Sequence, residues 1–220
     1  MFNFAQARTN MVDSQLRPNG ITDSRILDAM QSVAREQFVG SAQQSLAYMD
    51  ADVLLQGAAA GPRYLIEPMA FGRMLQLADI RETDRVLDIG AATGYGAAVL
   101  SQLVAQIVAL EEDAGLVEQA RINLKSVDNV SLIEGELSKG VPNTGNYDLI
   151  ILEGAVAEVP NALFSQIKNG GRLIAAVGSG AQAKCCVYVV SGQTHTRRAA
   201  FDITIAPLPG FAKAKAGFAF

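Results

Sequence analysis

The chain has 220 residues, of which 50% are hydrophobic and 18% are charged, and its formal net charge is −4. This length suits one domain of ordinary size with a substantial core, and the composition excludes a disordered chain. A net negative charge argues against broad binding to a phosphate backbone, so we expect no nucleic acid partner. Because charged residues interrupt every apolar run well before the roughly 18 residues that a membrane span needs, we expect a cytoplasmic protein.

The N-terminal part of the sequence predicts helices. Residues 1–20 have the composition of an irregular or partly helical arm that ends in a turn at 17–20. Thr22 or Asp23 can cap the helix that follows. The apolar residues of that helix keep helical spacing and are Ile26, Leu27, Met30 and Val33. We expect this helix to pack as an amphipathic cover.

Residues 57–61 are all glycine or alanine and are typical of a flexible loop. A helix with Phe71, Met74, Leu75 and Leu77 is expected after the segment that ends at Pro68. Arg63, Tyr64 and Glu67 are the polar residues nearest to the expected substrate position. The alternative for Arg63 and Glu67 is a simple surface ion pair, because the two residues are four positions apart.

The most informative stretch is 85–113, which predicts a strand, a glycine-bearing turn, a helix and a second strand. A short apolar run around Val86 has the pattern of a buried parallel strand, and the small residues 90–94 allow a sharp turn close to a ligand. The helix that begins at Tyr95 offers unpaired N–H groups to an anionic or polar ligand group. This arrangement predicts a nucleotide-type site, although a plain strand-to-helix connection is the alternative.

Glu111 ends the second strand, 23 positions after Asp88. This is close to the spacing of about 20 residues at which an acid binds ribose hydroxyls in nucleotide-binding βαβ units. The dinucleotide pattern G-x-G-x-x-G is not met, because Ala92 and Tyr95 occupy its second and third glycine positions. The pattern from Asp88 to Gly94 instead resembles the first motif of class I S-adenosylmethionine methyltransferases, with one glycine replaced by alanine.

The C-terminal half predicts further buried strands at 130–133, 147–152 and 173–177. Glu136, just after the first of these, can accept a hydrogen bond from an adenine amino group. A helix that begins at Pro160 and includes Leu163 and Ile167 should be capped by residues 169–171. Two apolar segments, 184–190 and 199–206, predict an antiparallel hairpin at the sheet edge.

The remaining reactive side chains favour structural roles. Cys185 and Cys186 are expected as buried strand residues and not as a metal site or a disulfide framework. His195 lies in a polar stretch and is expected as a solvated residue of the hairpin connection. Residues 211–220 combine aromatic, small and basic side chains, and they could dock on the body or serve a partner.

Together these segments resemble one family, the protein-L-isoaspartate O-methyltransferases. The similarity runs from about residue 21 to residue 210. The stretches that carry it are 21–30, 33–39, 47–50, 88–100, 157–160, 166–173 and 206–210.

The resemblance implies an α/β fold with a Rossmann-like, doubly wound and mostly parallel sheet, a C-terminal antiparallel hairpin and an N-terminal helical extension. It also implies methyl transfer from S-adenosylmethionine to an isoaspartyl carboxylate in damaged proteins or peptides. We expect residues 1–78 to form the extension and acceptor-side loop, and residues 79–220 the cofactor-binding domain, within one compact unit. The expected cofactor residues are Asp88, Gly90, Ala92, Gly94, Tyr95, Glu111 and Glu136, and those expected at the acceptor are Arg63, Tyr64, Ile66 and Glu67. Neither a metal nor an acid–base constellation is required.

The sequence departs from the family pattern at the acceptor-side loop. Ile66 stands where the family has a serine that hydrogen-bonds the substrate, and Glu67 adds a charge that would repel an anionic acceptor. Two alternatives therefore stay open: a methyltransferase with a different acceptor, and a non-catalytic cofactor-binding or regulatory module.

Overall fold

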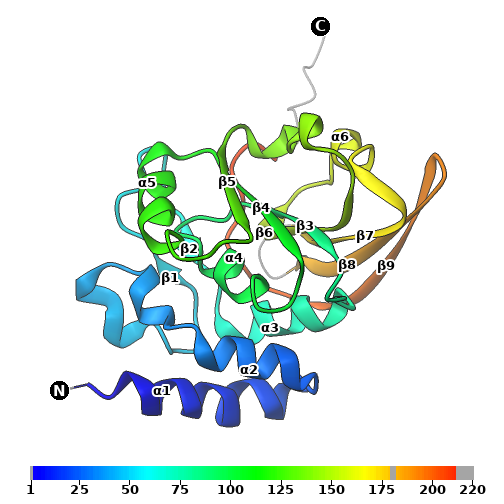
Figure 1. Cartoon of the computed structure of the whole chain (residues 1–220). Helices are drawn as coiled ribbons and strands as arrows, with labels where there is room; N and C mark the ends of the chain where they lie inside the picture. The colour runs from blue at the N-terminus through cyan, green and yellow to red at the C-terminus, as the bar shows by residue number, and fades with distance from the viewer. Residues whose placement is uncertain (1, 179–181, 212–220) are drawn as a thin grey trace, which may run out of the picture.

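The computed structural model describes residues 2–178 and 182–211 and, within them, one seven-stranded sheet (Figure 1). The strand order is β5-β4-β3-β6-β7-β8-β9. The first five strands in this order run parallel, whereas β8 and β9 are antiparallel to their neighbours. The strands are β3 (Arg85–Ile89), β4 (Gln106–Glu111), β5 (Val130–Glu134), β6 (Tyr147–Val156), β7 (Ile167–Val177), β8 (Lys184–Ser191) and β9 (Thr194–Asp202). The predicted fold class is confirmed, including the C-terminal antiparallel hairpin.

Both faces of the sheet are covered, as a doubly wound fold requires. Neighbouring residues of β3 show this: Val86 joins the hydrophobic cluster that also contains the N-terminal helices, and Leu87 joins the cluster on the opposite face. The helices are α1 (Phe4–Met11), α2 (Ser24–Ser32), α3 (Pro68–Leu77), α4 (Tyr95–Leu100), α5 (Ala114–Asn123) and α6 (Asn161–Phe164). Helices α1, α2 and α3 lie below the sheet in Figure 1, and α6 lies above it.

The N-terminal arm is helical over most of its length. After α1 the chain continues through a π-helical turn at Val12–Leu16 and a 3-10 turn at Arg17–Asn19. Asp23 caps α2 by accepting a hydrogen bond from the backbone N–H of Arg25, and the helix ends before Val33. Met11, Val12 and Leu16 are buried, so the arm is part of the core.

The predicted helix after Pro160 was too long. Helix α6 ends at Phe164, and Ile167, predicted to be helical, already pairs with Tyr147 as the first residue of β7. The predicted C-cap, residues 169–171, lies inside β7 at a register shift, where Gly170 takes a φ of 80°. Strand pairing between β6 and β7 therefore overrides the local preference of residues 169–171 for a turn.

The hairpin connection is shorter than predicted. Strand β9 begins at Thr194, so His195 lies in the strand and its ring stacks on Phe164 with centroids 3.8 Å apart. Cys185 and Cys186 are buried in β8, as expected. Of the predicted C-terminal tail, residues 212–220 lie outside the described residues, and Phe211 is buried in the second cluster.

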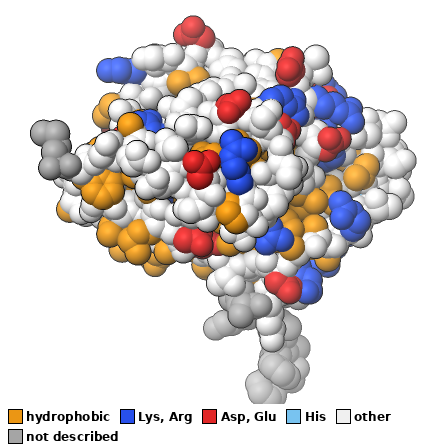
Figure 2. Space-filling view, turned by 90° about the horizontal axis from the view of Figure 1, so that it is seen from below, with side chains coloured by type: hydrophobic (Ala, Val, Ile, Leu, Met, Phe, Trp, Pro, Cys, Tyr) orange, Lys and Arg blue, Asp and Glu red, His pale blue; other side chains and the backbone are white. Residues whose placement is uncertain are grey.

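The N-terminal extension and the sheet share one hydrophobic cluster, which contains Met11, Phe71 and Val86. The division at residue 78 stays a prediction. In the described ranges the helices are too short or too polar to cross a membrane. On the face seen from below, basic and acidic side chains are interspersed (Figure 2), so that face carries no strip of one charge.

Candidate functional site

The glycine-bearing turn between β3 and α4 lies at the carboxyl edge of the sheet. Gly90 and Gly94 have φ values of 84° and 92°, in the left-handed region that glycine adopts without penalty. Ala92 is also left-handed, with a φ of 50°, at the position where the sequence motif has a glycine. The backbone N–H groups of Gly90 and Ala91 donate to the carbonyl of Leu110 and fix the turn against β4.

Glu111, at the end of β4, is fully buried and forms a bidentate ion pair with Arg63. Arg63 Nη1 lies 2.6 Å from Oε1, and Arg63 Nη2 lies 2.8 Å from Oε2. Backbone N–H groups of Ala92, Glu112 and Asp113 donate to the same carboxylate at 2.8, 2.9 and 3.0 Å. Arg63 therefore pairs with Glu111, and its predicted alternative, an ion pair with Glu67, is wrong.

Asp88 and Glu153 form a second acidic group, buried below the turn on the adjacent strands β3 and β6. Neither oxygen of Asp88 has a hydrogen-bond donor among the described residues. Burial, aided by the charge of Glu111, raises the pKa of Asp88 to about 7. Burial and the neighbouring Asp88 raise the pKa of Glu153 well above its ordinary value.

Tyr95 is buried behind the turn. Its ring packs against Phe38 and Phe71, with centroids 5.5 and 5.9 Å away. The guanidinium of Arg35 lies 4.7 Å from the ring centroid and donates to the backbone carbonyls of Ala47 and Ile66. Tyr95 thus joins the turn to the N-terminal segment by packing.

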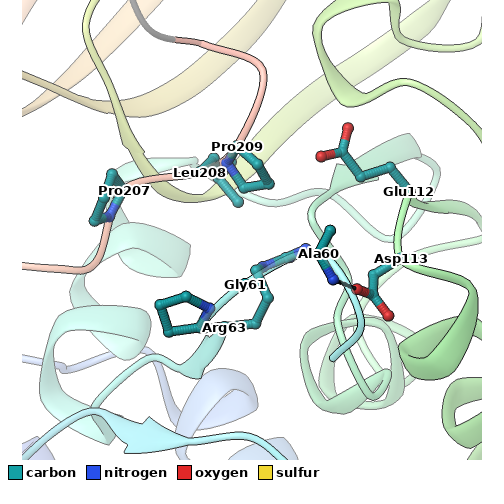
Figure 3. Close-up of a pocket in the computed structure, with 9 residues that line it drawn as sticks. Ala60, Gly61, Arg63, Glu112, Asp113, Pro207, Leu208 and Pro209 are labelled. Atoms are coloured by element: carbon teal, nitrogen blue, oxygen red, sulfur yellow. Dashed lines mark hydrogen bonds between the residues drawn. The ribbon is translucent and has the colours of Figure 1, made fainter. Parts of the chain in front are cut away.

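A cavity of about 240 Å³ opens beside Arg63 (Figure 3). It is lined by three short segments: residues 60–63, residues 112–113 and residues 207–209. The Asp113 carboxylate holds the first segment by accepting from the N–H groups of Ala59 and Ala60 at 2.6 and 2.9 Å. Arg63 is the one cation among the described residues that line the cavity.

The other predicted acceptor residues lie outside this lining. Tyr64 belongs to β2 (Tyr64–Leu65), which pairs with β1 (Val53–Leu54), and is half-buried. Ile66 is buried in the main hydrophobic cluster. Glu67 precedes α3 and is half-buried, and burial, aided by the charges of Asp50 and Asp52, raises the pKa of its carboxyl group.

Glu136, the predicted adenine ligand, follows β5 and is exposed. It forms a surface ion pair with Lys139 at 2.7 Å, which lowers the pKa of its carboxyl group. Sequence reasoning did not assign roles to Glu112, Asp113, Glu153 or residues 207–209. For Glu112 and Asp113 the signal was present, because they directly follow Glu111 in the sequence.

The turn and the buried acids fit S-adenosylmethionine, provided that Arg63 releases Glu111. The unpartnered carboxylate of Asp88 suits the cationic end of that molecule, since a buried anion needs a counter-charge. Glu111 suits a ribose, but only when Arg63 releases it. Gly90 is also covered, because a Cβ there would lie 2.6 Å from Cδ2 of Leu208.

Known proteins resemble this chain over nearly its whole length. A sequence model of the protein-L-isoaspartate(D-aspartate) O-methyltransferase family matches residues 6–202. A protein-L-isoaspartate O-methyltransferase of Koribacter versatilis is 39% identical over 80% of this chain and 78% of its own length. One from Herpetosiphon aurantiacus is 34% identical over 93% and 91% of the two chains.

Solved structures agree with the fold. A protein-L-isoaspartate O-methyltransferase superposes with a TM-score of 0.82 at 24% identity, over 92% of this chain and 66% of that one. A putative Plasmodium falciparum member in complex with S-adenosyl-L-homocysteine gives a TM-score of 0.75 at 18% identity, over 94% and 99% of the two chains. On the family match and the identity to these relatives, the chain belongs to the protein-L-isoaspartate(D-aspartate) O-methyltransferase family.

Proposed function

We propose that this protein transfers the methyl group of S-adenosylmethionine to the carboxylate of an isoaspartyl or D-aspartyl residue in a protein or peptide. The observation that carries this proposal is the family match over residues 6–202. The geometry of the turn supports it, because left-handed residues at 90, 92 and 94 hold the turn that the donor motif requires.

The reaction depends on alignment of the acceptor carboxylate with the methyl group more than on acid–base catalysis. A carboxylate is already ionised near neutral pH, so no general base is needed to activate it. One of its oxygens forms a bond to the methyl carbon while the carbon–sulfur bond breaks, and the electron pair of that bond stays on sulfur. The products are a methyl ester and S-adenosylhomocysteine, and no proton changes place.

The chain's own residues would contribute binding and orientation. Asp88 offers a buried negative charge next to the turn, and Glu111 offers carboxylate oxygens that backbone N–H groups hold in place. Residues 60–63 and 207–209 border the cavity and would exclude water from the reacting groups. Arg63 supplies the positive charge that an anionic acceptor needs.

A direct assay tests this function. The protein is incubated with methyl-labelled S-adenosylmethionine and either an isoaspartyl peptide or the same peptide with an ordinary aspartyl residue. Label that enters the isoaspartyl peptide alone, as a base-labile methyl ester, is the expected result. Binding of S-adenosylhomocysteine, measured by calorimetry, without label in either peptide would contradict the isoaspartyl assignment.

A second candidate function is methyl transfer to a different acceptor, or cofactor binding without transfer. The position of Ile66 favours it, because this side chain is buried in the core and offers no hydrogen bond to a substrate. A screen of other carboxylate acceptors with the same labelled donor separates these two possibilities.

A further inference from the structure

The hydrogen bonds of Glu111 leave no room for another donor. Its two oxygens accept from both terminal nitrogens of Arg63 and from the backbone N–H groups of Ala92, Glu112 and Asp113. A carboxylate has about four lone-pair sites, so these donors already saturate it. Ribose hydroxyls can reach Glu111 only if a donor leaves.

Arg63 is the donor that can leave. The three backbone donors belong to the turn after β3 and to the end of β4, which pairing with the neighbouring strands fixes. Arg63 follows a loop that joins two-residue strands, and hydrogen bonds of this loop with Asp113 and Gln119, together with the Arg63 ion pair, hold it to the cofactor side. Three backbone donors would still orient Glu111 after Arg63 had moved.

The space beside Arg63 is also too small for a complete ligand. The cavity of about 240 Å³ lies below the range of roughly 300–1,000 Å³ that is usual for small-molecule sites. Arg63 Nη2 lies 3.4 Å from the Gly90 carbonyl, and the side chain of Leu208 covers the same glycine. Arg63 and Leu208 together close the turn in this state.

We infer that Arg63 has two successive partners: Glu111 in the free protein, and the acceptor carboxylate once a ribose has taken Glu111. The first part depends only on cofactor binding, whereas the second rests on the proposed function. A guanidinium binds any carboxylate in the same bidentate geometry, so the exchange replaces one charge-assisted pair with another. It imposes an order in which the methyl donor binds before the acceptor.

The test measures binding of S-adenosylhomocysteine to the full chain by calorimetry. Arg63→Ala should lower the Kd about tenfold or more, because the ligand no longer competes with a buried charge-assisted pair. Arg63→Lys keeps a charge but loses the bidentate fork, so its Kd for S-adenosylhomocysteine should lie between the values of Arg63→Ala and the unaltered protein. Arg121→Ala is the matched control, since Arg121 pairs with Glu118 on the surface, and its Kd should be unchanged.

The second readout is the KM for an isoaspartyl peptide, which Arg63→Ala should raise about tenfold or more while it tightens cofactor binding. A merely structural role for Arg63 would weaken both. Unchanged or weaker S-adenosylhomocysteine binding by folded Arg63→Ala and Arg63→Lys overturns the inference, as does no binding by any of the proteins. A third outcome is tighter S-adenosylhomocysteine binding by Arg63→Ala but no peptide methylation by the unaltered protein. That outcome supports Glu111 as the first partner of Arg63 and rejects both the acceptor carboxylate as the second partner and the proposed function.

Discussion

The carboxyl groups of Asp88 and Glu153 lie buried on the neighbouring strands β3 and β6, and neither oxygen of Asp88 has a hydrogen-bond donor among the described residues. Burial and the nearby like charge disfavour the state in which both groups are ionised. The pair therefore takes up a proton on folding under conditions in which exposed carboxyl groups have lost theirs.

This pair gives stability a specific pH dependence. Because both pKa values are raised on folding, the native state binds more protons than the unfolded state between the ordinary carboxyl pKa, about 4, and at least the pKa of about 7 for Asp88. The free energy of unfolding should thus fall as the pH rises from 5 to 8. Glu153→Gln removes one of the two titrating groups and can offer an amide N–H to Asp88 at any pH, so it should flatten this fall and stabilise the protein at pH 8 by about 1–3 kcal/mol.

Urea unfolding at several pH values checks this prediction. Glu158→Gln is a suitable control, because Glu158 is exposed five positions further along the chain and should keep the slope of the unaltered protein. An equal slope in Glu153→Gln and the unaltered protein would show that the pair does not hold a proton.

The Arg63–Glu111 pair should respond unequally to loss of its two partners. Glu111→Gln leaves a buried guanidinium without a counter-charge, which should cost about 3–5 kcal/mol of unfolding free energy. Arg63→Ala should cost less, about 1–2 kcal/mol, because Glu111 keeps three backbone donors. Chemical denaturation at pH 7 measures both, with Arg121→Ala expected within about 0.5 kcal/mol of the unaltered protein. A greater loss in Arg63→Ala than in Glu111→Gln would contradict this account.

The strands and turn around Glu111 could be predicted because their signals are local. The apolar run at Val86, the small residues of the turn and the acid at the end of the next strand all lie within 30 consecutive residues. The Arg63–Glu111 pair joins residues 48 positions apart, and the far wall of the cavity comes from residues 207–209. No periodicity or spacing reports such contacts, which form only when the loop folds back on the sheet.

The errors in the C-terminal half have the same origin. The sequence around Gly170 has the composition of a turn. It nevertheless lies in β7, because β7 pairs with β6 on both sides of it, at Ile167 and at Arg172. Likewise, polar residues 194–198 form part of β9, since an edge strand exposed on both sides needs no apolar alternation. In both segments, strand pairing overrides local preference.

The left-handed conformation of Ala92 predicts an unusual response to glycine. Glycine removes the steric cost of a left-handed alanine, which is about 1–2 kcal/mol. This gain exceeds the loss of about 0.4–1 kcal/mol of stability that arises because glycine raises the conformational entropy of the unfolded chain. Ala92→Gly should therefore raise the free energy of unfolding by up to about 1 kcal/mol. Ala91→Gly is the control at the adjacent buried position, and it should destabilise by about 1 kcal/mol because Ala91 is not left-handed. Loss of stability in both variants would refute this explanation of residue 92.

Ile66 occupies the position at which the family resemblance implies a substrate-binding serine. Its side chain is 5% exposed and lies in the main hydrophobic cluster, and its carbonyl accepts a hydrogen bond from the buried Arg35. Ile66→Ser should therefore lower the free energy of unfolding by about 2–5 kcal/mol through lost apolar contacts, whereas Ile66→Val should cost about 0.5–1.5 kcal/mol. Restoring the serine alone should not raise the rate on an isoaspartyl peptide, because the new hydroxyl would point into the core. A folded Ile66→Ser protein with a clearly higher rate would show instead that this segment turns toward the acceptor when the methyl donor is bound.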